Sequence, residues 1–203
     1  GFTFAQDAPL WMRHSVISPD GTTIVFTYKG DIYTVPVAGG RAMQITTNPA
    51  YDTAPVWSPD SKRIAFASDR MGSLDVYIVA KDGGEPRRLT THSGSETPLA
   101  FTDAGHVLFS AGIMPSAEAV VFPSNGQFNQ VYRVSVEGGR PTMISSMPME
   151  CISINKEGAM LYQDKKGYED YWRKHHVSPI ARDIWMYTCL LYTSPSPRDG
   201  ATS

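Results

Sequence analysis

The sequence lacks the features that define several large classes of protein. Its 203 residues include two cysteines, Cys151 and Cys189, so a framework of several disulfides is excluded. No stretch approaches the ~20 apolar residues that a membrane-spanning helix needs. The formal net charge of −2 gives no excess of positive charge for a nucleic acid to bind. We therefore expect neither a membrane span nor a nucleic-acid partner.

What the sequence does contain is a high content of turn-forming residues. Glycine and proline number 17 and 15, and hydrophobic residues make up 41% of the chain. This composition excludes disordered, collagen-like and coiled-coil chains, which have fewer apolar residues or strict residue periods. It indicates a globular protein with many turns.

A turn followed by an apolar strand recurs four times along the chain. The clearest copies are the Ser-Pro-Asp-Gly turn at 18–21 and the Ser-Pro-Asp-Ser turn at 58–61, and weaker copies begin at Thr102 and Asn155. Proline presets φ, aspartate hydrogen-bonds to nearby backbone, and glycine accepts a positive φ. Each copy therefore predicts a strand–turn–strand unit.

A second sequence motif follows each of these turns. It combines a polar residue, an apolar residue and an aromatic residue, and it occurs at 31–35, 75–79, 130–134 and 183–187. A pair of glycines follows the first three copies, which suits a tight β-hairpin. These pairs lie at 39–40, 83–84 and 138–139.

Four short strands per unit, repeated at a period of about 40–55 residues, are the sequence signature of a β-propeller. The sequence therefore predicts an all-β fold, a β-propeller fragment with three complete four-stranded blades and most of a fourth. The predicted blades span residues 9–50, 51–98, 99–150 and 151–188. Trp57 and Phe66 are predicted to lie in the core between blades. A β-sandwich with fortuitous internal similarity is the alternative.

The order of Ser-Pro-Asp-Gly, Asp-Ile-Tyr, paired glycines and Leu-Thr resembles the WD40-like repeat of the TolB and tricorn propellers, over nearly all of residues 9–187. The segments Pro9–Arg13 and Trp172–His176 are similar to segments of exported tricorn-type peptidases. In that family the propeller precedes a PDZ-like module and a serine peptidase domain. The resemblance implies a non-catalytic propeller that gates or docks peptide or protein substrates for downstream peptidase domains. A TolB-like periplasmic interaction module, the propeller of a prolyl-oligopeptidase-type hydrolase and a propeller lyase are the alternatives.

The two ends of the chain differ from the repeats. Residues 1–5 resemble the end of a secretory signal peptide, with small Thr3 and Ala5 where signal peptidases require them. Residues 189–203 contain a string that resembles the translation of a transposase-type sequencing adaptor. We therefore expect an exported, periplasmic or extracellular protein whose partial propeller spans residues 6–188, followed by an adaptor artefact that is not native. An apolar N-terminal strand and a natural Ser/Pro-rich tail are the alternatives.

Insertions in the third and fourth blades form the candidate binding surface. The segment between the second and third strands is longer there, over Gly112–Asn129 and around Tyr168–His176, than in the first two blades. Both insertions leave the same face of the predicted propeller, and repeat proteins build binding surfaces from such one-sided loops. The candidate residues, mostly of the types that carry interface energy, are Tyr168, Tyr171, Trp172, Arg173, His175, His176, Phe122 and Phe128. Ordinary loops whose aromatic side chains pack on the blades are the alternative.

The sequence contains no pattern typical of a catalytic or metal site. A Gly-x-Ser-x-Gly nucleophile motif is absent, and the paired glycines precede strands rather than the helices that bind phosphate. His175 and His176 are adjacent, so in an extended segment their side chains point in opposite directions and rarely share one metal ion. Asp31, Asp75 and Asp183 recur at one place in the repeat, which indicates a structural role. We expect no catalytic residue, no metal and no cofactor in this chain.

Overall fold

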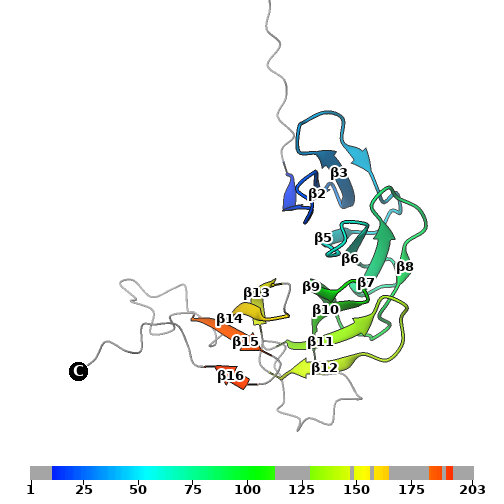
Figure 1. Ribbon diagram of the computed structural model, residues 1–203. Helices are drawn as coiled ribbons and strands as arrows, with labels where there is room; N and C mark the ends of the chain where they lie inside the picture. Colours follow the sequence, from blue (N-terminus) through cyan, green and yellow to red (C-terminus); the bar gives the residue numbers. More distant parts are fainter. Residues whose placement is uncertain are drawn as a thin grey trace, which may run out of the picture.

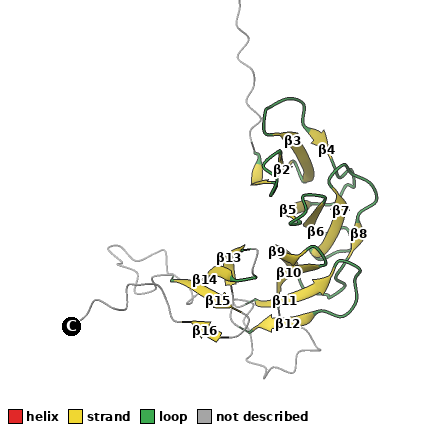
Figure 2. Cartoon of the chain, viewed as in Figure 1, coloured by secondary structure: helices red, strands yellow, loops and turns green. Residues whose placement is uncertain are grey.

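Four antiparallel sheets, each of four strands, follow one another along the chain and are arranged in an arc (Figure 1). The computed structural model describes residues 11–112, 129–146, 149–155, 158–164, 183–188 and 191–193. Strands that are consecutive in the sequence are neighbours in each sheet, and the described residues contain no helix (Figure 2). The prediction of an all-β propeller with three complete blades and most of a fourth is confirmed.

The first two blades have the same plan. The first blade comprises β1 (Arg13–Ile17), β2 (Thr23–Tyr28), β3 (Asp31–Pro36) and β4 (Met43–Gln44). The second blade comprises β5 (Asp52–Trp57), β6 (Arg63–Ser68), β7 (Asp75–Ala80) and β8 (Arg87–Arg88). In each blade the first strand lies at the inner edge of the arc, and the short last strand lies at the outer edge (Figure 1).

The third and fourth blades repeat this plan. The third comprises β9 (Glu96–Asp103), β10 (His106–Ala111), β11 (Gln130–Ser135) and β12 (Thr142–Ser145). The fourth comprises β13 (Met149–Ile154), β14 (Met160–Asp164), β15 (Ile184–Thr188) and β16 (Leu191–Thr193), the last falling within the adaptor-like segment. Strands β9 and β13 begin at Glu96 and Met149, slightly before the predicted blade starts at 99 and 151.

Side-chain hydrogen bonds close the Ser-Pro-Asp turn between the first two strands of a blade. The Ser18 hydroxyl donates to Asp20 Oδ1 at 2.5 Å, and the Thr22 N–H donates to the same oxygen at 3.0 Å. These bonds lower the pKa of Asp20 to about 2, and the bond from Ser18 has the largest effect. The second blade repeats the arrangement with Ser58 and Asp60. Hydrogen bonds among neighbouring residues, from Ser18 to Thr22, thus hold the turn in place, as the motif predicted.

The core lies between blades rather than inside any one sheet. The central strands of the second and third blades are buried on both faces, because alternate side chains pack against the preceding and the following blade. Between the first and second blades, Val25 and Ile32 pack with Ile64, Phe66 and Tyr77. The Phe66 and Tyr77 rings stack with centroids 6.0 Å apart.

The same alternation continues through the other two interfaces. Ala65 and Val76 of the second blade pack with Phe109 and Tyr132 of the third. The next interface centres on Leu108, Val131, Met160 and Tyr162. Trp57 is also buried, in the interface between the first two blades, so its predicted place and that of Phe66 are confirmed.

Candidate functional site

The binding residues predicted from the two insertions lie outside the described residues. Tyr168, Tyr171, Trp172, Arg173, His175 and His176 fall in the segment between β14 and β15, and Phe122 and Phe128 fall in the segment between β10 and β11. Their role as a binding surface therefore stays a prediction. The strand order does place both segments at equivalent positions of their blades, as the repeat predicted.

An apolar groove follows the inner edge of the arc. It has a volume of about 620 Å³ and takes residues from the ends of β1, β5, β9 and β13 and from the turns that follow them. We call it the inner groove. Its apolar lining is Val16, Ile17, Pro19, Val56, Trp57, Pro59, Leu99, Ala100, Phe101, Ile152 and Ile154. Four polar residues, Thr102, Asp103, Ser153 and Asn155, lie among them, so the groove combines apolar walls with a few hydrogen-bonding groups.

One inter-blade hydrogen bond supports the wall of the inner groove. The Trp57 indole Nε1–H donates to the Val16 carbonyl at 3.1 Å, joining β5 to β1. This bond satisfies the polar atom of a ring that is otherwise buried among apolar side chains. Ile17, beside it, is 53% exposed and presents an apolar surface to the groove.

β-Bulges shape the innermost strands on which the inner groove is built. The register shifts between Arg13 and Val16 in β1, and equivalent shifts occur in β5 and β13. In each bulge one residue has φ of +51°, and these residues are His14, Ala54 and Cys151. Residues other than glycine rarely adopt this backbone conformation. A bulge bends a strand and redirects its side chains. Sequence reasoning missed the bulges because none of the three residues signals a positive φ.

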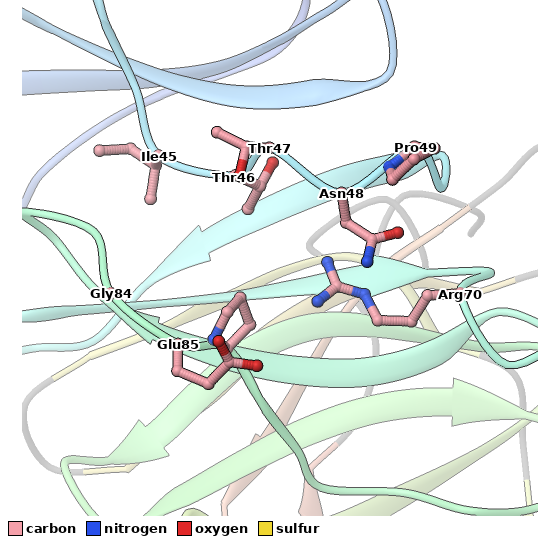
Figure 3. A pocket seen from close by; sticks show the side chains of 9 residues that line it. Ile45, Thr46, Thr47, Asn48, Pro49, Arg70, Gly84 and Glu85 are labelled. Atoms are coloured by element: carbon pink, nitrogen blue, oxygen red, sulfur yellow. The ribbon is translucent and has the colours of Figure 1, made fainter.

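A second, polar groove lies at the outer side of the arc between the first and second blades. It has a volume of about 280 Å³ and we call it the outer groove. Figure 3 shows its lining, which comes from the segment after β4, from the loop after β6 and from the segment before β8. The lining residues are Ile45, Thr46, Thr47, Asn48, Pro49, Arg70, Gly84, Glu85 and Pro86.

Arg70 is the charged centre of the outer groove. Its Nη2 donates to both carboxylate oxygens of Asp52, at 3.1 and 3.0 Å, and its Nε donates to Ser68 Oγ at 2.8 Å. The guanidinium also lies over the Tyr77 ring, 4.5 Å from its centroid. A two-oxygen contact of this kind holds the guanidinium in one orientation. Sequence reasoning also missed Arg70, since an isolated arginine after a strand carries no recognisable motif.

Equivalent threonines receive backbone hydrogen bonds at the start of the third strand. Thr46 Oγ1 accepts the Ile32 N–H at 2.9 Å, and Thr90 Oγ1 accepts the Val76 N–H at 2.9 Å. Backbone bonds then join the first blade to the second and the second to the third at the same level. The Asp52 N–H donates to the Gly30 carbonyl and the Glu96 N–H to the Leu74 carbonyl, each at 2.7 Å.

Buried acidic side chains accompany these contacts. Asp31 lies near Asp52. Burial is the main cause that raises the pKa of Asp31, and the negative charge of Asp52 raises it further. At the next interface Glu96 is fully buried near Asp75. Burial is the main cause that raises the pKa of Glu96 to about 8, and the negative charge of Asp75 contributes to the rise. Arg88 Nη2 lies 2.8 Å from Asp75 Oδ2. Asp31 accepts hydrogen bonds from Gln44 and Thr46 of the first blade, and Asp75 pairs with Arg88 of the second, which supports the structural role predicted for them.

Neither a metal site nor a membrane span is found in the part of the chain that the structure describes. No group of three or more histidine, cysteine or acidic side chains there has the arrangement to hold a metal ion. None of the described segments forms a helix that is long and apolar enough to cross a membrane.

Consecutive four-stranded antiparallel sheets, with their first strands innermost and apolar side chains packed between them, define a WD40-like β-propeller. Within that class the chain matches the family described as Tricorn protease N-terminal beta propeller domain over residues 9–193. The chain belongs to this family.

Named relatives agree with this membership. The chain is 24% identical over 180 residues to Tricorn protease homolog 1 of Streptomyces coelicolor, which covers 88% of this chain and 16% of that protein. It is 31% identical over 108 residues to the uncharacterized peptidase YuxL of Bacillus subtilis, covering 47% and 16%. It is 44% identical over 55 residues to the Tol-Pal system protein TolB of Bordetella pertussis, covering 27% and 13%. The chain thus spans less than a fifth of the length of each of these relatives.

Solved structures share the fold. A putative TolB from Agrobacterium tumefaciens superimposes with a TM-score of 0.66 at 17% identity, covering 88% of this chain and 58% of that one. The tricorn protease superimposes with a TM-score of 0.62 at 12% identity, covering 87% and 21%. At these identities the likeness concerns the fold alone.

Proposed function

We propose that this chain is the substrate-docking propeller of an exported, tricorn-like serine peptidase. The inner groove carries the proposal, because it is an open apolar surface at the inner edge of a propeller that belongs to a peptidase-associated family. Ligand sites are typically concave and mainly apolar with a few polar groups. The propeller itself supplies no chemistry in this proposal, and downstream domains of the same protein cleave the peptide.

The inner groove would hold a peptide by its side chains. Val16, Leu99, Ile152 and Ile154 offer apolar contacts to side chains on one face of an extended peptide. Asp103 and Asn155 at the turns offer hydrogen-bonding groups to its backbone. Such a surface favours peptides with large apolar side chains over polar ones, because apolar burial supplies the free energy of binding.

Replacing Ile17 by serine tests the inner groove. Ile17 is exposed in the groove, so Ile17→Ser removes apolar contact without opening a cavity in the core. We expect the variant to bind the capped peptide acetyl-Ala-Phe-Ala-Leu-Ala-amide about tenfold more weakly, since burying one large apolar side chain contributes roughly 1.5 kcal/mol. Fluorescence anisotropy of the labelled peptide measures this affinity.

Val37→Ser is the matched control for this measurement. Val37 is an exposed aliphatic residue outside both grooves, so its replacement should leave peptide affinity unchanged. Equal affinity of the Ile17→Ser variant and the unaltered chain would contradict docking in the inner groove.

The genomic locus tests the rest of the proposal. A reading frame that continues into a serine peptidase domain supports it, and a frame that ends soon after the last blade favours a TolB-like interaction module instead. The TolB alternative has a specific observation in its favour, the 44% identity over 55 residues. A downstream Gly-x-Ser-x-Gly motif would instead indicate a prolyl-oligopeptidase-type hydrolase. Sequencing the locus without adaptors also tests our proposal that residues 189–203 are not native.

A further inference from the structure

The outer groove contains two hydrogen-bond donors that face each other. The first belongs to Asn48, whose side-chain Oδ1 accepts the Ala50 N–H at 3.0 Å. This bond settles the orientation of the amide, because the two ends of an asparagine side chain are told apart by their partners. The Nδ2 group is consequently directed toward the Arg70 guanidinium, as Figure 3 shows.

The second donor belongs to Arg70. Its Nε and Nη2 groups are engaged by Ser68 and Asp52, which leaves Nη1 without a hydrogen-bond acceptor among the described residues. Two N–H donors on facing side chains repel each other unless an acceptor lies between them. Asn48 is exposed and the Arg70 side chain is 12% exposed, so an oxygen that enters the groove can accept from both donors.

The charge of the groove selects a neutral oxygen over an anionic one. Asp52 neutralises Arg70 through a two-oxygen contact at about 3 Å. Glu85, which also lines the groove, adds a negative charge that disfavours phosphate or a free carboxylate. A group that combines an oxygen acceptor with an N–H donor matches Arg70 and Asn48 on one side and Glu85 on the other. The peptide bond is such a group.

We propose that the outer groove binds an extended peptide segment through its backbone, with a carbonyl oxygen held by Asn48 Nδ2 and Arg70 Nη1 and an N–H directed to Glu85. Pro49, Pro86 and Ile45 supply apolar walls for the adjacent side chains. The inference rests on the proposed function, since it gives a peptide-docking propeller a second contact point. It differs in recognising the backbone rather than apolar side chains.

The substitution Asn48→Asp tests this proposal. The aspartate keeps an oxygen to accept the Ala50 N–H but presents an acceptor, in place of a donor, to Arg70. We expect it to weaken binding of acetyl-pentaalanine-amide, a peptide with backbone groups and no large side chains, at least tenfold. Its thermal unfolding temperature should not fall, because the new carboxylate faces the Nη1 group of Arg70. Isothermal titration calorimetry and a thermal melt measure the two effects.

Two further variants keep the test decisive. Asn48→Ser also retains an oxygen for the Ala50 N–H and lacks the amide donor, so it should weaken binding even if Asn48→Asp folds poorly. Lys81→Gln changes the net charge by the same amount as Asn48→Asp at an exposed site outside both grooves, and it should bind like the unaltered chain.

The outcomes separate this inference from the proposed function. Unchanged affinity for acetyl-pentaalanine-amide in both Asn48 variants overturns the outer-groove site. The site is also overturned if the unaltered chain fails to bind this peptide but binds the apolar peptide in a manner weakened by Ile17→Ser, in which case docking in the inner groove stands. Loss of affinity in both Asn48 variants, with Lys81→Gln unaffected, supports the inference.

Discussion

Small serine residues in the turns stabilise the fold through the hydrogen bonds of their side chains. Ser58 is fully buried, donates to Asp60 Oδ1 at 2.5 Å and accepts the Arg63 N–H at 2.9 Å. Ser18 does the same in the first blade. One hydroxyl thus fixes the turn and satisfies the first backbone donor of the second strand, which a buried serine can do and an alanine cannot.

The substitution Ser58→Ala tests this residue. It leaves the Arg63 N–H without its side-chain acceptor and the Asp60 carboxylate with only the Lys62 N–H as a hydrogen-bond donor, so we expect a loss of about 1–3 kcal/mol in the free energy of unfolding. Ser146→Ala, at an exposed serine, is the control and should change it by less than about 0.5 kcal/mol. Urea unfolding followed by tryptophan fluorescence measures both. Equal effects of the two substitutions would refute the role of Ser58.

Strands of neighbouring blades meet at the blade interfaces, where acidic side chains are buried close to one another. At the interface of the second and third blades, Glu96 at the start of β9 accepts a hydrogen bond from Thr90 Oγ1 at 3.0 Å. Asp75 from β7 and His92 from the segment before β9 also face it, with His92 Nδ1 3.4 Å from the carboxylate. The positive charge of Arg88 from β8 partly offsets the effect of Asp75 on the pKa of Glu96. The interface thus holds a carboxyl group that prefers to be protonated.

This preference makes the stability of the interface depend on pH. Burial and Asp75 raise the pKa of Glu96 from 4.5 to about 8, so the folded chain holds a proton that the unfolded chain has released. The free energy of unfolding should therefore fall as the pH rises from about 5 to about 8, because stability falls with pH wherever the folded state binds more protons. Urea unfolding at several pH values between 5 and 9 measures the slope.

The substitution Glu96→Gln should flatten this dependence. Glutamine resembles the protonated acid in shape and hydrogen bonding and does not titrate. A variant that keeps the slope of the unaltered chain would show that a group other than Glu96 is responsible.

The molecule as a whole presents apolar surface on the free face of the fourth blade. The second and third blades are covered on both faces, whereas Leu161, Ile184 and Met186 on the fourth are large apolar residues that are exposed. Contiguous exposed apolar surface and unpaired blade edges favour association.

We expect the isolated chain to associate with itself as its concentration rises. Ile184→Glu should reduce this association, because Ile184 is 61% exposed on the free face of the fourth blade. Met71→Glu is the control, since Met71 is 64% exposed in the loop between β6 and β7. Sedimentation velocity over a range of concentrations measures the effect, and a chain that stays monomeric throughout would contradict it.

Most of the fold, and little of the candidate site, could be predicted from the sequence. The turn at 18–21 and the paired glycines signal their own backbone conformations, so the order of strands and the inter-blade place of Phe66 could be inferred from local patterns. The bulges at His14 and Cys151 could not, because tertiary packing imposes those φ values on residues that do not favour them. The outer groove could not either, since it depends on Asn48 and Arg70 meeting across a blade interface.

The strictly sequential pairing of strands has a consequence for how the protein is made. Every sheet joins strands that follow one another along the chain, so its hydrogen bonds close as soon as a short stretch of polypeptide has emerged. Contacts that are near in sequence form quickly, and domains synthesised first tend to fold first. Each blade can therefore pair its strands while the next is still being delivered, and it buries its apolar side chains when the following blade packs against its exposed face.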